Sequence, residues 1–122
     1  MPADIPWGGV AELELAPRLR RLPVVMALGR EVRLACGLRA RLLGLAALDR
    51  EAAGGGLLIP CCASVHTFGM RFALDLYFLD GRGEAIGARL ALPPKRFAFC
   101  RGASAVLELP AGTGGEIASP FS

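Results

Sequence analysis

The sequence is poor in residues that commonly build active sites. Its 122 residues include one histidine, one tyrosine, one tryptophan and four cysteines. No apolar run reaches the ~18 residues that suggest a membrane-spanning helix. The N-terminal residues contain an early acidic residue and lack the apolar segment of a secretory signal. We therefore expect no membrane span and a cytoplasmic location.

The net charge is also small. The formal net charge is +3 and the isoelectric point is near 8.9, a mildly basic balance that requires no nucleic acid to explain it. Lys95, Arg96 and Arg101 do alternate with Phe97 and Phe99, a mixture that can meet phosphates and bases. So few positive charges are more typical of an edge strand with solvated arginines, and the sequence predicts no nucleic-acid partner.

The four cysteines follow no zinc-binding template, and adjacent cysteines rarely form a disulfide framework. Cys36, Cys61, Cys62 and Cys100 are therefore predicted to be reduced, buried thiols, and no cofactor is expected. The alternative is a metal site at Cys61, Cys62 and His66. Their C-C-x₃-H spacing can bend around zinc or copper, with Cys36 or Cys100 needed as a fourth ligand.

Composition favours one folded domain. Hydrophobic residues make up 53% of the chain and the mean hydropathy is +0.46, values that argue against disorder. Residues 1–20 are rich in proline and weakly patterned, but residues 10–15 alternate. We therefore predict an N-terminal extension or added edge segment over 1–20, followed by a single compact, mostly β domain over 21–122.

Residues 70–80 carry the strongest strand pattern. One face of this stretch is apolar throughout and the other is mixed, which indicates a strand with one face on a core. Tyr77 and Leu79 make the mixed face too apolar for full exposure, so the strand is predicted inside a sheet. The following Asp80-Gly81-Arg82-Gly83 predicts a tight turn and a hairpin.

The rest of the chain reads as short strands and one helix. Leu38 to Ala53 is predicted helical, weakened at Gly44 and stopped by the glycines at 54–56. Residues 22–35 are expected to form two short strands around Gly29 or one bent strand. Further strands are expected at 57–59, 65–68, 84–92 and 104–109, with a loop or edge at 95–102. This pattern predicts a mostly β (α+β) fold, an antiparallel β-sandwich or barrel-like sheet with one short α-helix.

Three blocks of sequence resemble the family called domain of unknown function 192. They are Arg41-x-x-Gly44-Leu45, the run from Gly56 through His66-Thr67-Phe68-Gly69-Met70 to Asp80, and Ala105 to Gly112, read AVLELPAG. The blocks span about residues 39–112. The resemblance implies a compact, mostly β domain with a short helix. It implies no activity, because the family has no established reaction.

His66, Thr67 and Asp75 form the most interesting polar set. If the strand at 65–68 pairs beside the strand that holds Asp75, an Asp75–His66 hydrogen bond would orient the imidazole. The structural alternative is that these side chains satisfy buried backbone groups. Arg41 lies on an otherwise apolar helix and is expected to pair with Glu108, Asp75 or a neighbour on the helix itself.

These residues leave three functions open. The leading one is a non-catalytic ligand-binding or accessory domain whose ligand region holds His66, Thr67, Asp75, Arg41 and Glu108. The second is a small hydrolase or metal-dependent enzyme that uses His66 with Cys61, Cys62 or Asp75, although no G-x-S-x-G elbow is present. The third is a protein-interaction module that pairs through an exposed edge strand. The partner is therefore a small-molecule ligand or another protein.

Overall fold

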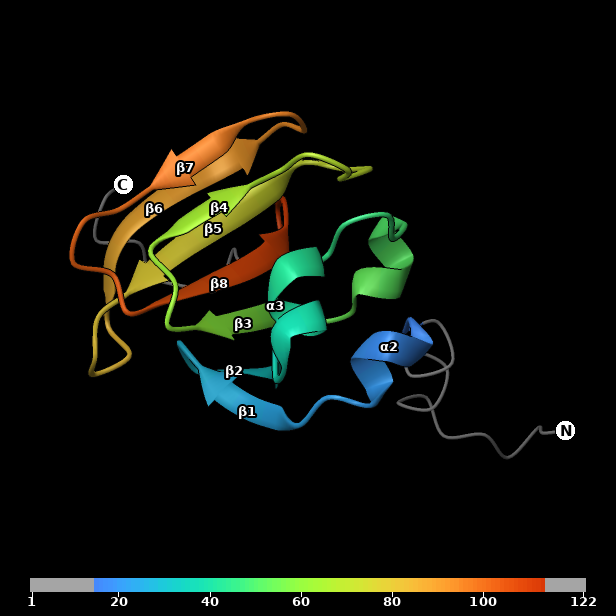
Figure 1. Cartoon of the computed structure of the whole chain (residues 1–122), viewed down its shortest axis with the longest axis horizontal. Coiled ribbons are helices and arrows are strands. Elements are labelled where there is room, and N and C mark those ends of the chain that lie inside the picture. Colours follow the sequence, from blue (N-terminus) through green and yellow to red (C-terminus); the bar gives the residue numbers. More distant parts are fainter. Residues whose placement is uncertain (1–14, 114–122) are drawn as a thin grey trace, which may run out of the picture.

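The computed structural model describes residues 15–113 (Figure 1). Its helical elements are α2 (Pro17–Arg20), α3 (Leu38–Leu43) and the 3-10 turn η1 (Arg50–Ala53). Its strands are β1 (Val24–Ala27), β2 (Arg30–Leu34), β3 (Leu57–Pro60), β4 (Ser64–His66), β5 (Leu74–Leu79), β6 (Ala85–Leu92), β7 (Phe97–Phe99) and β8 (Ala105–Pro110). No helix in this part of the chain is long and apolar enough to cross a membrane.

The strands form a six-stranded sheet in the order β1-β2-β3-β8-β5-β6 and a separate two-stranded sheet of β4 and β7. The predicted mostly β class is confirmed. The sheet is antiparallel, as predicted, except at one pair, because β2 and β3 run parallel. Parallel neighbours need a long crossover. Here the crossover is the segment that holds α3 and η1 (Figure 1).

Strand β5 lies between β8 and β6, and all six of its residues are buried. Its alternate residues Leu74, Leu76 and Phe78 enter one hydrophobic core, and Tyr77 and Leu79 enter another on the opposite face. The predicted alternation and interior position are therefore confirmed. The strand is shorter than predicted, because residues 70–73 lie outside it, with a bend at 71 and 72.

The predicted hairpin after β5 is also present. The Asp80 carboxylate accepts hydrogen bonds from the backbone N–H groups of Arg82 and Glu84, at 2.8 and 3.0 Å. These bonds lower the pKa of Asp80. The chain then returns as β6, paired antiparallel with β5.

The predicted helix over 38–53 is wrong beyond its first half. α3 ends at Leu43. Gly44 follows it with φ 51° and ψ −131°, a backbone conformation that does not occur inside an α-helix. Ala47 also has a positive φ, and residues 44–47 form a turn, with two irregular residues before η1 begins. Residues 44–47 therefore form a loop, named here the Gly44 loop, where the sequence pattern predicts a helix.

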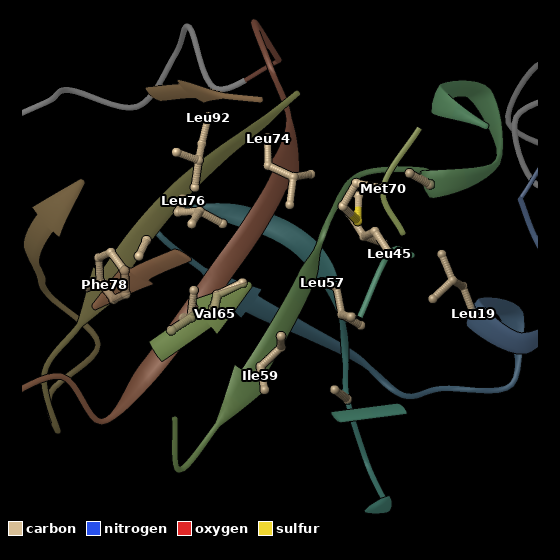
Figure 2. Close-up of a cluster of buried hydrophobic side chains, with 14 of the residues drawn as sticks. Leu19, Leu45, Leu57, Ile59, Val65, Met70, Leu74, Leu76, Phe78 and Leu92 are labelled. Carbon is tan, nitrogen blue, oxygen red and sulfur yellow. The ribbon is translucent and has the colours of Figure 1, made fainter. Parts of the chain in front are cut away.

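The larger core lies between the six-stranded sheet and the layer made by α2, the Gly44 loop and the β4–β7 sheet. Figure 2 shows side chains from all these parts, among them Leu19, Leu45, Val65 and Leu76. Leu15, Ala16 and Leu19 from the predicted N-terminal extension are buried in this core. The alternation predicted over 10–15 lies, apart from Leu15, outside the described residues.

Candidate functional site

A cleft of about 320 Å³ opens between the α3 region, the β4–β7 sheet and one face of the large sheet. Its wall is mainly apolar, with a few polar groups. The lining residues are Arg41, Leu43, Gly44, Ala46, Ile59, Cys62, Ser64, Val65, His66, Phe68, Met70, Phe97 and Glu108. Ligand sites commonly have this composition, a largely apolar surface with a small number of polar groups.

Glu108 is the unusual member of this lining. It lies on β8 opposite the buried Leu57 of β3 and Leu76 of β5. Its exposed fraction is 3%, and its Oε1 atom has no hydrogen-bond partner among the described residues. Burial raises the pKa of Glu108 to about 7, opposed by the backbone N–H of Leu45. A buried carboxyl group therefore lines the cleft with one oxygen unsatisfied.

The Gly44 loop is shaped around this carboxyl group. A Cβ atom at Gly44 would lie 2.8 Å from Glu108 Oε1, so a side chain there would collide with it. Arg18 of α2 holds the loop from outside. Its Nη2 donates to the carbonyl oxygens of Gly44 at 3.0 Å and Ala46 at 2.7 Å. Glycine at position 44 thus allows Glu108 and the loop backbone to approach closely.

Two aromatic rings lie beside His66 on the β4–β7 side of the cleft. The imidazole lies 5.9 Å from the ring of Phe68 and 6.3 Å from that of Phe97, and the two phenylalanine rings are 5.3 Å apart. Phe68 and Phe97 are exposed, at 45% and 72%. These rings form a partly exposed aromatic wall beside the polar groups.

Arg41 does not form the predicted ion pair. Its Nη2 donates to the carbonyl oxygen of Cys61 at 3.3 Å. No ion pair joins it to Glu108 or Asp75 among the described residues, where Arg71 and Asp49 form a surface pair at 3.0 Å. Arg41 lies in the last turn of α3, which ends at Leu43, and its side chain is exposed.

Thr67 is fully buried and does not line the cleft. Its hydroxyl donates to the carbonyl oxygen of Pro93 at 2.7 Å and accepts from the backbone N–H of Arg96 at 2.8 Å. The side chain therefore joins the segment after β4 to the segment before β7.

Asp75 lies on the opposite face of the large sheet, beside Tyr77 in the strand alternation. Its two carboxylate oxygens accept from the backbone N–H groups of Ala91 at 2.7 Å and Gly112 at 3.0 Å. Asp75 thus satisfies backbone groups, which is the structural alternative considered from the sequence. The Asp75–His66 hydrogen bond, the other possibility, is absent from the described part of the chain, where β4 pairs with β7 rather than beside β5.

The cysteines are free thiols, as predicted, but the prediction that they are buried is wrong. Cys36 and Cys61 are exposed, and Cys62 and Cys100 are half-buried. Cys62 lines the cleft, and its Sγ donates to the carbonyl oxygen of Ser64 at 3.0 Å. Across residues 15–113, no three His, Cys, Asp or Glu side chains are placed to hold a metal ion, so Cys61, Cys62 and His66 do not form the considered site.

The structure thus brings together three of the five predicted ligand-region residues, Arg41, His66 and Glu108, and places Thr67 and Asp75 elsewhere. Sequence reasoning missed Gly44, Phe68 and Phe97 as parts of the site. The glycine interrupting an apolar helix pattern was the available signal. No comparable signal marked the two phenylalanines, because their proximity depends on the β4–β7 pairing.

Solved structures of two other proteins share the fold. One, from Sinorhizobium meliloti 1021 and described as a "putative transcription regulator", is 23% identical, with a TM-score of 0.60, and the match covers 76% of this chain and 81% of that one. The other, a protein of unknown function from Novosphingobium aromaticivorans DSM 12444, is 21% identical with a TM-score of 0.56, covering 77% and 74%. At these identities the likeness shows the fold alone.

No curated protein matches the chain significantly. A family model does match, over residues 25–118, which include every strand of the large sheet except the first residue of β1. Its description is DUF192, "Uncharacterized ACR, COG1430". The resemblance carried by the Gly44, His66 and Glu108 blocks is therefore confirmed, and the chain belongs to the uncharacterised DUF192 family.

Proposed function

We propose that this chain is a non-catalytic domain that binds a small molecule in the cleft lined by Arg41, His66 and Glu108. The observation that carries the proposal is the unsatisfied Oε1 of Glu108. A buried polar atom without a partner costs roughly 1–3 kcal/mol, and more for a charged group. A ligand that donates to this oxygen would recover that cost.

Comparison with the other buried polar side chains supports a binding role. Thr67 and Asp75 are the remaining buried polar residues of the described chain, and each has partners for its side-chain oxygens. A purely architectural Glu108 would be expected to be satisfied in the same way. Its environment instead combines a missing donor with an adjoining cleft of ligand size.

A thermal-shift screen of small molecules, followed by native mass spectrometry, tests the proposal. Compounds that bind the cleft should raise the melting temperature of the wild type and of Glu84→Gln, a control that changes an exposed carboxylate. The same compounds should lose most of their effect on Glu108→Gln. A screen without stabilising compounds, or compounds that stabilise all three proteins equally, would count against the cleft.

A second candidate is a small hydrolase, and one observation favours it. The Glu108 pKa of about 7 suits proton transfer near neutral pH, and His66 and Cys62 line the same cleft. Cys61 and Asp75, also considered from the sequence, do not line it. If this candidate is correct, His66→Ala will abolish turnover of a substrate while leaving the melting temperature unchanged, because His66 is an exposed side chain.

A further inference from the structure

The cleft holds one acidic and one basic side chain that do not pair with each other. Glu108 lines it as a buried carboxyl group, and Arg41 lines it as an exposed guanidinium group. The two form no ion pair in the part of the chain that the structure describes. An acidic and a basic group are thus both available to one ligand.

Each group has binding capacity left over. The Glu108 carboxyl group lines the cleft and its buried Oε1 has no donor, so the group keeps the capacity to accept from an ammonium group. Arg41 uses Nη2 in one long hydrogen bond to Cys61, whereas a guanidinium group carries five N–H donors in a planar fork. That fork matches a carboxylate, which it can bind through two parallel hydrogen bonds.

The remaining wall is suited to an apolar body. Ile59 and Met70 come from the side of the large core, and Phe68 and Phe97 contribute the aromatic wall. A volume of about 320 Å³ is at the small end of the range for ligand sites. The ligand is therefore small, with an apolar part between two charged ends or beside them.

We propose that the cleft binds a small zwitterion with an apolar body, the chemistry of an apolar α-amino acid. Its ammonium group lies against Glu108 Oε1 and its carboxylate against the Arg41 guanidinium group. This inference rests on the proposed function and adds the class of ligand.

The pairing makes binding depend on pH. An ammonium group is held best by ionised Glu108, and the pKa of the empty site is about 7. Protonation of Glu108 at pH 6 therefore weakens the apparent affinity about tenfold relative to pH 8. The other ionisable groups that line the cleft are Arg41 on α3, His66 on β4 and the Cys62 thiol before it. A parallel titration of His66→Gln separates the contribution of the imidazole.

Three probes with the same aromatic body test the inference by NMR titration: L-phenylalanine, 2-phenylethylamine and 3-phenylpropionate. L-phenylalanine should shift resonances of cleft residues and bind at least tenfold more tightly than the other two. Glu108→Gln and Arg41→Gln should each weaken it at least tenfold, whereas Arg82→Gln, which changes an exposed turn arginine, should not. Arg41 is exposed, so its variant gives an answer even if Glu108→Gln folds poorly.

Two results would overturn the inference. One is that no probe shifts the cleft resonances, and the other is that the amine or the acid binds as tightly as L-phenylalanine. These results are distinguishable from failure of the proposed function. A compound from the thermal-shift screen whose binding requires Glu108 but not Arg41 would contradict zwitterion binding and still support the proposed binding function.

Discussion

At the scale of single residues, the decisive contact is between Gly44 and Glu108. Gly44 adopts a backbone conformation that L-residues with a side chain rarely take, and its missing Cβ leaves room for Oε1. The resulting close approach places an unsatisfied carboxyl group beside the cleft. One residue that looks like a helix defect in the sequence is thus required for the shape of the site.

Gly44→Ala is expected to destabilise the protein by about 1–3 kcal/mol from backbone strain alone, with the 2.8 Å contact to Oε1 adding to it. The melting temperature should fall by several degrees. Gly83→Ala is the matched control, because Gly83 also has a positive φ but a Cβ atom added there would meet no atom within 4 Å. Equal losses in the two variants would show that contact with Glu108 contributes nothing.

At the scale of elements, Thr67 connects the β4–β7 sheet to the rest of the fold. Its backbone N–H donates to the carbonyl oxygen of Arg96, its carbonyl oxygen accepts from Met70 and Lys95, and its hydroxyl bridges Pro93 and Arg96. These bonds fix the chain on both sides of the small sheet. Because His66 and Phe97 belong to that sheet, Thr67 holds the aromatic wall in position from outside the cleft.

Thr67→Val keeps the side-chain volume but leaves the Arg96 N–H without its hydroxyl acceptor and removes the donor to Pro93. We expect a loss of about 1–3 kcal/mol in unfolding free energy, measured by denaturant titration. Faster amide exchange at Arg96 should accompany it. Thr113→Val removes one hydroxyl bond, to the carbonyl oxygen of Pro110, from an exposed threonine and should cost less, about 0.5–1 kcal/mol. A Thr67 variant no less stable than this control would contradict the assignment.

The elements that the sequence predicts well are those governed by local pattern. The alternation in β5 and the Asp80 turn are both present, because a two-residue period and short side-chain-to-backbone bonds need no distant partner. The helix predicted over 38–53 ends early, at the glycine that packs against Glu108, and this contact with a residue more than sixty positions away is not visible in the local sequence pattern. The Asp75–His66 hydrogen bond considered from the sequence does not form for a similar reason, because the sequence of β4 alone does not determine which strand pairs with it.

The candidate site was predicted in part. Arg41, His66 and Glu108 stood out because charged or titratable groups in apolar segments require an explanation. Whether Arg41 and Glu108 pair with each other could not be predicted, since this depends on where α3 ends and on how deeply Glu108 is buried in β8. The aromatic wall could not be predicted either, because Phe68 and Phe97 meet only through the β4–β7 pairing.

At the scale of the whole molecule, Glu108 links folding stability to pH. Its pKa is raised from 4.5 to about 7 on folding. Between these values the folded protein keeps a proton that the unfolded chain has lost, so stability falls as pH rises through this window. The total decline from this group is about 3 kcal/mol, and it is complete above pH 7. The lowered pKa of Asp80 acts in the opposite direction and only at lower pH.

Glu108→Gln should remove this decline. The melting temperature of the variant minus that of the wild type is expected to increase by several degrees between pH 4.5 and pH 8, measured by calorimetry. Glu84→Gln, in the exposed turn, should show no such trend. A difference between Glu108→Gln and the wild type that stays constant across this range would mean that Glu108 titrates alike in the folded and unfolded chains.

The most direct test of the account is an NMR titration of the Glu108 side-chain carboxyl carbon in the ligand-free protein. The account predicts a midpoint at about pH 7, since the group is buried beside the cleft with one oxygen unsatisfied. A midpoint near the ordinary value of 4.5 would show a solvated or partnered carboxylate. That result would contradict the claim that Glu108 is a buried binding group that lacks a hydrogen-bond donor in the ligand-free protein.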